Sequence, residues 1–267
     1  MFKKTLFGVF CLLSLIACTP PAKHFAEIAD SYGFNGFSIN SEQFEHQFYV
    51  NQAVMQPSAD QKLHVYLDGD GTPWEQQRWV ADDPTSRNPM ILAMMQQDKA
   101  AAVFLGRPCY HGLNHTSACH LKYWTSHRYS AEVVRSMVAA LKKCLIKYPF
   151  KQLVLIGYSG GGTLAALIAP YFPEVKTLVT VAANLDVAAW SRHHGYQALN
   201  ESLNPAVLPL NPQLRQIHLA GLEDTVVPAW IIKTYAQGQV NARYLPYAHF
   251  DHACCWVDEW SKILLLL

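Results

Sequence analysis

The segment that most constrains the fold is an apolar run followed at once by glycines and a serine. Gln152-Leu-Val-Leu-Ile156 precedes Gly157-Tyr-Ser-Gly-Gly161, and the small-residue run 163–169 follows. A continuous apolar run of this length is typical of a strand buried on both faces. A sharp turn from such a strand into a helix needs residues without side chains and leaves the central residue strained and exposed. The pattern therefore predicts a strand, a tight turn and a helix, with Ser159 at the turn.

Short apolar runs alternate with helical patterns over the rest of the chain. The expected strands are residues 63–67, 101–105, 175–182, 215–220 and 242–245, and the expected helices are residues 88–95, 131–147, 229–237 and 254–267. Strands that alternate with helices at this spacing predict the α/β class, with a mostly parallel, doubly wound sheet and flanking helices.

The N-terminus has the layout of a secretory signal peptide. A basic start precedes an apolar stretch, residues 6–17, that is too short to span a bilayer as a helix, because about 20 apolar residues are needed. Leu15-Ile-Ala-Cys18 resembles the lipobox of bacterial lipoproteins. This resemblance implies that residues 1–17 are removed and that lipidated Cys18 anchors the protein. An ordinary signal peptide with an incidental cysteine is the alternative.

The rest of the chain is expected to be one domain behind a short linker. Residues 18–35 are predicted to form a tether and residues 36–267 the α/β domain. Thr19, rather than Asp, follows Cys18, which favours the outer membrane, facing the periplasm, as the location of the exported protein. We expect no nucleic-acid partner, because 21 Lys and Arg against 20 Asp and Glu give a net charge of +1 and no basic field. The oligomeric state stays open.

Five cysteines remain once Cys11 and Cys18 are set aside, and an exported protein is expected to pair them. Cys109 and Cys119 flank a short polar loop and could close it. The pairing among Cys109, Cys119, Cys144, Cys254 and Cys255 stays open, with one thiol left over. Histidines near Cys109 suggest zinc, but their spacing matches no closed zinc site, so we expect no metal.

A serine hydroxyl is a weak nucleophile unless a base and an orienting carboxylate assist it. Gly221-Leu-Glu-Asp-Thr-Val-Val-Pro228 follows an expected strand and places an acid at its carboxyl end. Asp224 is preferred to Glu223 because G-x-x-D-x-x-V-P resembles the loop that carries the acid of the catalytic triad in α/β-hydrolases. The expected order is Ser, then acid, then His. His252 lies just before the last helix and is preferred as the base, with His249 as the alternative.

Two backbone N–H groups are needed to bind the oxyanion of an acyl-transfer intermediate. One is expected from Gly160, after the nucleophile, and the other from Asp70 in the loop Asp68-Gly-Asp-Gly71, after an earlier strand. A calcium loop is the competing interpretation of this motif, but the full ligand pattern is absent. In the segment 107–128, Arg107 or Arg128 is expected to form ion pairs, and Tyr110 and Trp124 to line a pocket.

Taken together, these motifs resemble the α/β-hydrolase superfamily over essentially the whole mature chain. Leu67-Asp-Gly-Asp-Gly71, Leu105-Gly-Arg-Pro-Cys109, Trp124-Thr-Ser-His-Arg-Tyr129, Gly157-Tyr-Ser-Gly-Gly-Gly162 and Asn184-Leu-Asp186 are similar to sequences in a group of bacterial α/β-hydrolase lipoproteins. The resemblance implies the α/β-hydrolase fold with no large cap domain.

The expected activity is hydrolysis of a carboxylic ester through an acyl-enzyme, with Ser159, Asp224 and His252 as the catalytic triad and without a cofactor. The substrate class is a small-molecule or lipid acyl ester. A peptidase, thioesterase or acyltransferase on the same site remains open, as does a lipoprotein that uses the fold for binding without catalysis.

Overall fold

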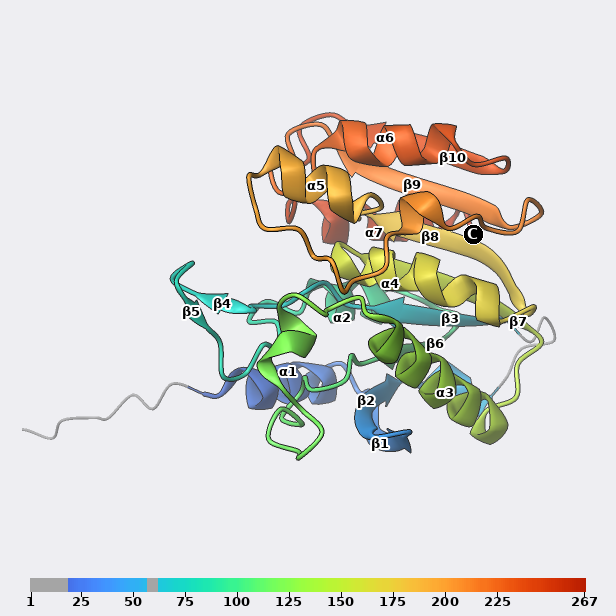
Figure 1. Ribbon diagram of the computed structural model, residues 1–267. Coiled ribbons are helices and arrows are strands. Elements are labelled where there is room, and N and C mark those ends of the chain that lie inside the picture. Colours follow the sequence, from blue (N-terminus) through green and yellow to red (C-terminus); the bar gives the residue numbers. More distant parts are fainter. Residues whose placement is uncertain (1–18, 57–61) are drawn as a thin grey trace, which may run out of the picture.

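The computed structural model describes residues 19–56 and 62–267, which fold around one eight-stranded sheet (Figure 1). The lipidation prediction at Cys18 and the signal peptide therefore lie outside the described residues. The strands of the large sheet are β1 (Asn35–Ser41), β2 (Phe44–Val50), β3 (Lys62–Leu67), β6 (Ala101–Leu105), β7 (Gln152–Tyr158), β8 (Val175–Val181), β9 (Arg215–Gly221) and β10 (Ala242–Tyr247). A separate two-stranded ribbon consists of β4 (Trp74–Glu75) and β5 (Trp79–Val80).

The sheet is mostly parallel, as predicted. Its strand order is β1-β2-β6-β3-β7-β8-β9-β10. The pairs β1–β2 and β2–β6 are antiparallel, and every later neighbour pair is parallel. Leu67 at the end of β3 is paired with Gly157 in β7, so the loops after these two strands leave the sheet side by side.

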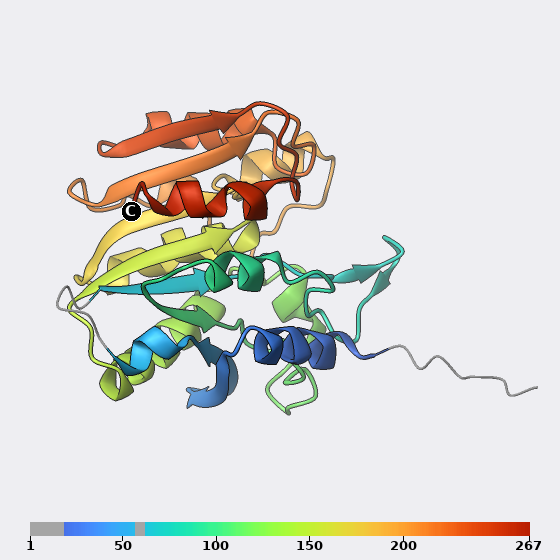
Figure 2. The same ribbon diagram turned by 180° about the vertical axis from the view of Figure 1, so that it is seen from behind.

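Helices cover both faces of the sheet, which makes the fold doubly wound (Figures 1 and 2). The helices are α1 (Pro21–Ser31), α2 (Met90–Gln96), α3 (Ala131–Lys147), α4 (Gly160–Ile168), α5 (Val187–His193), α6 (Ala229–Gln237) and α7 (Trp256–Leu264). Short 3-10 turns are η1 (Gln52–Met55), η2 (Leu121–Trp124), η3 (Ala169–Tyr171) and η4 (Pro205–Val207). Buried side chains of α3 and α4 belong to one apolar core, and those of α1, α2 and α7 belong to the other.

The chain follows the predicted alternation because the central strands are apolar throughout. In β7, Leu153, Leu155 and Ile156 are fully buried, as expected for a strand covered on both faces. All strands expected from the sequence are present and end within roughly two residues of the predicted bounds. Within the described part of the chain, the connections between strands and helices form no separate cap domain, in line with the predicted absence of a large cap.

The tether predicted over residues 18–35 is wrong for most of its length, because Pro21–Ser31 form helix α1. Proline suits the first turn of a helix, where its missing N–H needs no partner. Phe25 and Ala29 lie four residues apart on one face of α1 and are fully buried. The Phe25 ring lies 5.2 Å from the Phe104 ring on β6, so α1 is part of the folded domain.

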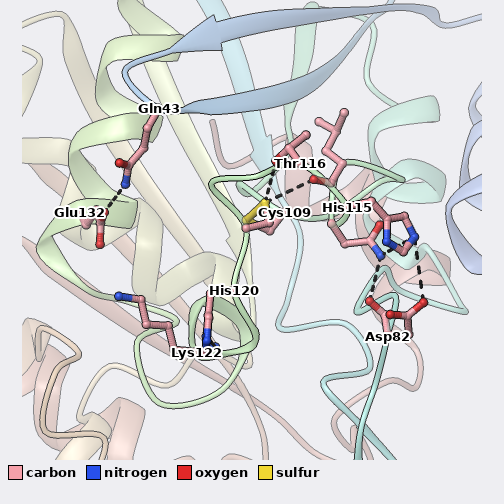
Figure 3. Close-up of a disulfide and its surroundings, with 11 residues drawn as sticks. Gln43, Asp82, Cys109, His115, Thr116, His120, Lys122 and Glu132 are labelled. Atoms are coloured by element: carbon pink, nitrogen blue, oxygen red, sulfur yellow. Dashed lines mark hydrogen bonds and ion pairs between the residues drawn. A yellow bond between two sulfur atoms is a disulfide. The ribbon is translucent and has the colours of Figure 1, made fainter.

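The cysteines of the described chain are paired except for one. Cys109 and Cys119 form a disulfide that closes the loop after β6, one of the pairings that the sequence leaves open (Figure 3). The adjacent Cys254 and Cys255 are joined to each other. Cys144 is a buried free thiol in α3, and burial raises its pKa to about 12, so it stays protonated and unreactive at neutral pH.

No group of three or more His, Cys, Asp or Glu side chains within 19–56 and 62–267 is placed to hold a metal ion. None of the helices in this part of the chain is both long and apolar enough to cross a bilayer.

Candidate active site

Ser159 lies at the turn between β7 and α4, as its sequence context predicts. Its backbone has φ +50°, a conformation that residues with side chains rarely adopt. A side chain on Gly157 would overlap the backbone of Gly161, and one on Gly161 would overlap the backbone of Leu67. The turn can therefore form only with glycine at these two positions, and it holds the serine side chain at the carboxyl edge of the sheet.

Three side chains from separate loops meet at this edge. His252 Nε2 lies 3.0 Å from Ser159 Oγ, and His252 Nδ1 lies 2.8 Å from Asp224 Oδ2. The Asp224 carboxylate is fully buried, whereas the His252 side chain keeps 19% of its surface exposed. The imidazole thus bridges a hydroxyl and a buried carboxylate, the arrangement that lets a histidine accept a proton from the hydroxyl.

The loop after β9 fixes the carboxylate. The other oxygen of Asp224 accepts hydrogen bonds from the backbone N–H groups of Val226 and Val227, each at 2.8 Å. Glu223, the alternative acid of the sequence analysis, points elsewhere. It pairs with His249 at 3.0 Å, and this pair is exposed, with 90% of the histidine side chain in solvent.

The loop after β10 carries His252 and is held from two sides. The hydroxyl of Tyr158, the residue before Ser159, donates to the His252 carbonyl at 3.0 Å. The indole N–H of Trp256 lies 3.2 Å from the same carbonyl. Since Trp256 is fully buried at the start of α7, the histidine backbone is tied to the core rather than to a free loop.

Asp70 is placed beside Ser159 by the loop after β3, and both its carboxylate and its backbone are held. Its carboxylate accepts from Arg107 Nη1 at 2.5 Å, from Arg128 Nη1 at 2.9 Å and from the Tyr129 hydroxyl at 2.7 Å. Its backbone carbonyl accepts from the Tyr110 hydroxyl at 3.0 Å. The ion pairs expected for Arg107 or Arg128 are therefore both made, to one carboxylate.

The same carboxylate lies directly against the turn after the serine. A side chain on Gly160 would overlap Asp70 Oδ1 and would meet the Tyr129 hydroxyl at 2.6 Å. The N–H groups of Gly160 and Asp70 make no hydrogen bond to any other group in the described chain. They are thus two donors in one loop cluster, held in place by the side-chain network behind them.

The positive and negative charges in this cluster do not cancel. Burial disfavours the ionised form of Asp70, but the guanidiniums of Arg128 and Arg107 outweigh it and hold its pKa well below the usual range. One carboxylate and two guanidiniums leave a net positive charge behind the two N–H groups. Asp68, two residues earlier, differs, because burial raises its pKa to about 7 despite a hydrogen bond from the Gly69 N–H.

Two aromatic residues lie elsewhere than predicted, and the contacts of the Asp70 carboxylate have no signal in the sequence. Tyr110 and Trp124 do not line a pocket, because each is 2% exposed. The Trp124 indole instead donates to the Ala81 carbonyl at 3.0 Å. Two surface hollows of the described chain, lined by residues including Phe150 and Tyr171 or Val54 and Tyr148, lie away from Ser159.

Comparisons with known proteins agree with this fold. Residues 97–216 match a family model described as the alpha/beta hydrolase fold. A sequence comparison with curated proteins finds no match.

Solved structures with similar folds include several hydrolases. A lidless α/β serine hydrolase from Xanthomonas campestris is 9% identical, with a TM-score of 0.56, covering 87% of this chain and 94% of that one. An esterase from Pyrococcus furiosus is 13% identical, with a TM-score of 0.60 and coverage of 94% and 95%. Est1E from Butyrivibrio proteoclasticus, with ferulic acid bound, is 12% identical, with a TM-score of 0.59 and coverage of 86% and 98%. Together with the sheet order and the turn at Ser159, these matches show that the chain has the α/β-hydrolase fold.

Proposed function

We propose that this protein is a serine hydrolase that cleaves carboxylic esters through an acyl-enzyme, with Ser159, His252 and Asp224 as its catalytic triad. The observation that carries the proposal is the imidazole of His252, which lies 3.0 Å from the Ser159 hydroxyl and 2.8 Å from Asp224. A hydroxyl becomes an effective nucleophile when a base in hydrogen-bond contact takes its proton as the new bond forms.

The reaction begins with attack of Ser159 Oγ on the ester carbonyl carbon, while its proton passes to His252 Nε2. Asp224 accepts the hydrogen bond from Nδ1–H and stabilises the imidazolium. The proton then moves to the departing alkoxide, which leaves as an alcohol and so forms the acyl-enzyme. Water attacks the acyl carbon with His252 as its base, and the acid and free serine are released.

The tetrahedral intermediate carries a negative charge on the former carbonyl oxygen. We assign its stabilisation to the N–H groups of Gly160 and Asp70. Removing one such donor in a serine hydrolase lowers kcat by about 100- to 1,000-fold. The guanidiniums of Arg107 and Arg128 exceed the charge of the Asp70 carboxylate, so the field behind these donors favours the oxyanion rather than opposing it.

The substrate class follows from the open position of the site. Ser159 is half-buried, and residues 19–56 and 62–267 form no separate cap domain over it. Among proteins of similar fold, one is described as a serine hydrolase without a lid and another as an esterase. We infer a small-molecule or lipid acyl ester as substrate, because an open serine admits an ester presented from solution or from a surface.

We also propose that the protein is exported and is anchored by a lipid on Cys18 in a bacterial membrane, on the periplasmic side of the outer membrane. The basis is the sequence Leu15-Ile-Ala-Cys18 after a short apolar stretch. Several acyl chains on one cysteine would hold the protein stably, since each buried methylene contributes about 0.8 kcal/mol. Mass spectrometry of the mature N-terminus would detect the modified cysteine.

The catalytic proposal is tested with Ser159→Ala and a short-chain p-nitrophenyl ester. Turnover should be lost while the thermal unfolding curve stays that of the wild type. Ser261→Ala is the matched control, because Ser261 is an exposed serine on α7 whose hydroxyl contacts Gln97 instead of the site. Equal turnover by Ser159→Ala and wild type would rule out Ser159 as the nucleophile.

A further inference from the structure

The two-stranded ribbon β4–β5 is an exposed element that the proposed reaction does not use. Every residue from Trp74 to Trp79 is exposed, and Trp74 and Trp79 are 44% and 60% exposed. The ribbon is closed at its base by a hydrogen bond from the Ala81 N–H to the Pro73 carbonyl at 3.0 Å. Figure 1 shows it standing out from the body of the molecule.

The two tryptophans lie on opposite faces of this ribbon. Trp74 is paired with Val80, and Trp79 is paired with Glu75. Because successive residues of a strand point to opposite faces, Trp74 shares a face with Val80 and Trp79 shares the other with Glu75. Both faces of the ribbon therefore present a large aromatic side chain to the surroundings.

The ribbon is tied to the start of the folded domain. The N–H of Ala22, in the first turn of α1, donates to the Asp83 carboxylate at 3.0 Å, three residues beyond the end of β5. Only Thr19 and Pro20 separate Cys18 from α1. Figures 1 and 2 both show the ribbon on the side of the molecule where α1 begins.

The ribbon also belongs to the edge of the sheet that carries Ser159. It follows β3 after the loop with Asp70, and Leu67 of β3 is paired with Gly157 of β7. One surface can therefore be approached by three parts of the molecule together, namely the start of α1, the β4–β5 ribbon and Ser159.

We propose that the β4–β5 ribbon is a bilayer-contacting element that inserts Trp74 and Trp79 at the headgroup level of the membrane that holds Cys18. The proposal rests on the proposed lipid anchor, and it deepens the proposed function by directing the Ser159 edge toward esters held in or at that bilayer. With two residues between the anchor and α1, the domain stays close to the membrane surface.

Lipid is favoured over a protein partner by the arrangement of the two indoles. A flat protein surface would cover one face of the ribbon and leave the other tryptophan in water, whereas a bilayer interface surrounds a ribbon that enters it tip first. Tryptophan is enriched at this depth because its ring is apolar and its N–H is polar. The Arg78 guanidinium, 5.2 Å from the centre of the Trp79 ring, can remain at the phosphates.

The test uses the full mature protein reconstituted into vesicles of phosphatidylethanolamine and phosphatidylglycerol, with bromine on the acyl chains as a quencher of tryptophan fluorescence. Wild type should be quenched, and Trp74→Phe/Trp79→Phe should lose most of that quenching, because the other tryptophans either are buried or lie on α5 and α6. Tyr171→Phe is the control, since Tyr171 is an aromatic residue that is 47% exposed just before β8, at the other end of the strands.

A second readout compares two substrates. Trp74→Ser/Trp79→Ser should turn over a soluble short-chain ester like wild type but should lose about tenfold or more on an ester embedded in vesicles, because two interfacial side chains are removed. The proposal would be overturned if Trp74→Phe/Trp79→Phe were quenched as strongly as wild type. It would also be overturned if Trp74→Ser/Trp79→Ser raised the KM for the soluble ester alone, because the ribbon would then be a substrate-binding flap. Because quenching needs no turnover, Ser159→Ala should still be quenched, and a failed ester assay would leave the membrane result standing.

Discussion

Arg128 Nη1 donates to Asp70 Oδ2 at 2.9 Å, and the same carboxylate fills the space that a side chain on Gly160 would need. Arg107 holds the other oxygen at 2.5 Å. The two backbone donors proposed for the oxyanion, Gly160 and Asp70, are thereby joined through one charged cluster. Their relative position depends on side chains that do not themselves contact the reacting atoms.

Asp70→Asn should weaken this cluster while keeping its size. The amide still accepts hydrogen bonds, but the Arg107 guanidinium, only 3% exposed, loses its counter-charge. We expect kcat to fall about 10- to 100-fold with a smaller change in KM, below the loss seen when an oxyanion donor is removed outright. Stability should fall by about 3 kcal/mol, as for a broken buried ion pair. A folded Asp70→Asn variant with wild-type kcat would show that the cluster does not position the donors.

Gly160→Ala tests the same contact from the other side. Its new methyl group would overlap Asp70 Oδ1 and meet the Tyr129 hydroxyl at 2.6 Å. Overpacking of this kind costs about 1–3 kcal/mol and should also displace the donors, so both melting temperature and kcat should fall. The control is Gly238→Ala, whose methyl group would approach no closer than 3.4 Å to the Tyr235 carbonyl. Equal losses in the two variants would contradict the proposed crowding at Gly160.

Asp68 makes stability depend on pH in a defined direction. Burial raises its pKa to about 7, so the folded protein keeps a proton that the unfolded chain has already released. The contribution of Asp68 to the free energy of unfolding therefore falls as pH rises from about 4 to about 7, by about 4 kcal/mol at most. Asp68→Asn mimics the protonated form and should stabilise the protein at pH 8 more than at pH 4. Urea unfolding at both pH values measures this difference, and an equal effect at both would refute it.

The two histidines of the last loop give a matched pair of variants. His252→Ala should lower kcat/KM by about a thousandfold or more, because the proton acceptor of Ser159 is removed. His249→Ala should stay near wild type, since its side chain is 90% exposed and contacts Glu223 instead. Kinetics on a soluble ester measures both. The reverse order of losses would assign the base to His249.

The strand, turn and helix around Ser159 are predictable because their signal is local. Residues 153–156 are buried on both faces of the sheet. Gly157 and Gly161 are required because a side chain on either would overlap backbone a few residues away or in the neighbouring strand. The loops that carry Asp224 and His252 follow strands whose order in the sheet is set by the alternation of the chain. The structure brings these side chains together with Ser159 as the chain order suggested.

The contacts of Asp70 and the packing of helix α1 join segments that are far apart in the sequence. Asp70 contacts Arg107 and Arg128, which follow it by 37 and 58 positions, and nothing in this spacing selects its carboxylate as the partner of both arginines. The prolines and scattered polar residues before residue 35 resemble a linker, which is why the sequence does not predict helix α1. The spacing of Phe25, Ile28 and Ala29 is nevertheless that of one helix face.

Labelling with a fluorophosphonate probe tests the central claim most directly, because only an activated serine reacts at an appreciable rate. Peptide mass spectrometry should place one adduct on Ser159 of the wild-type protein, and the adduct should be absent in Ser159→Ala and strongly reduced in His252→Ala. An unlabelled folded wild type, or an adduct on any other serine, would contradict the proposed triad.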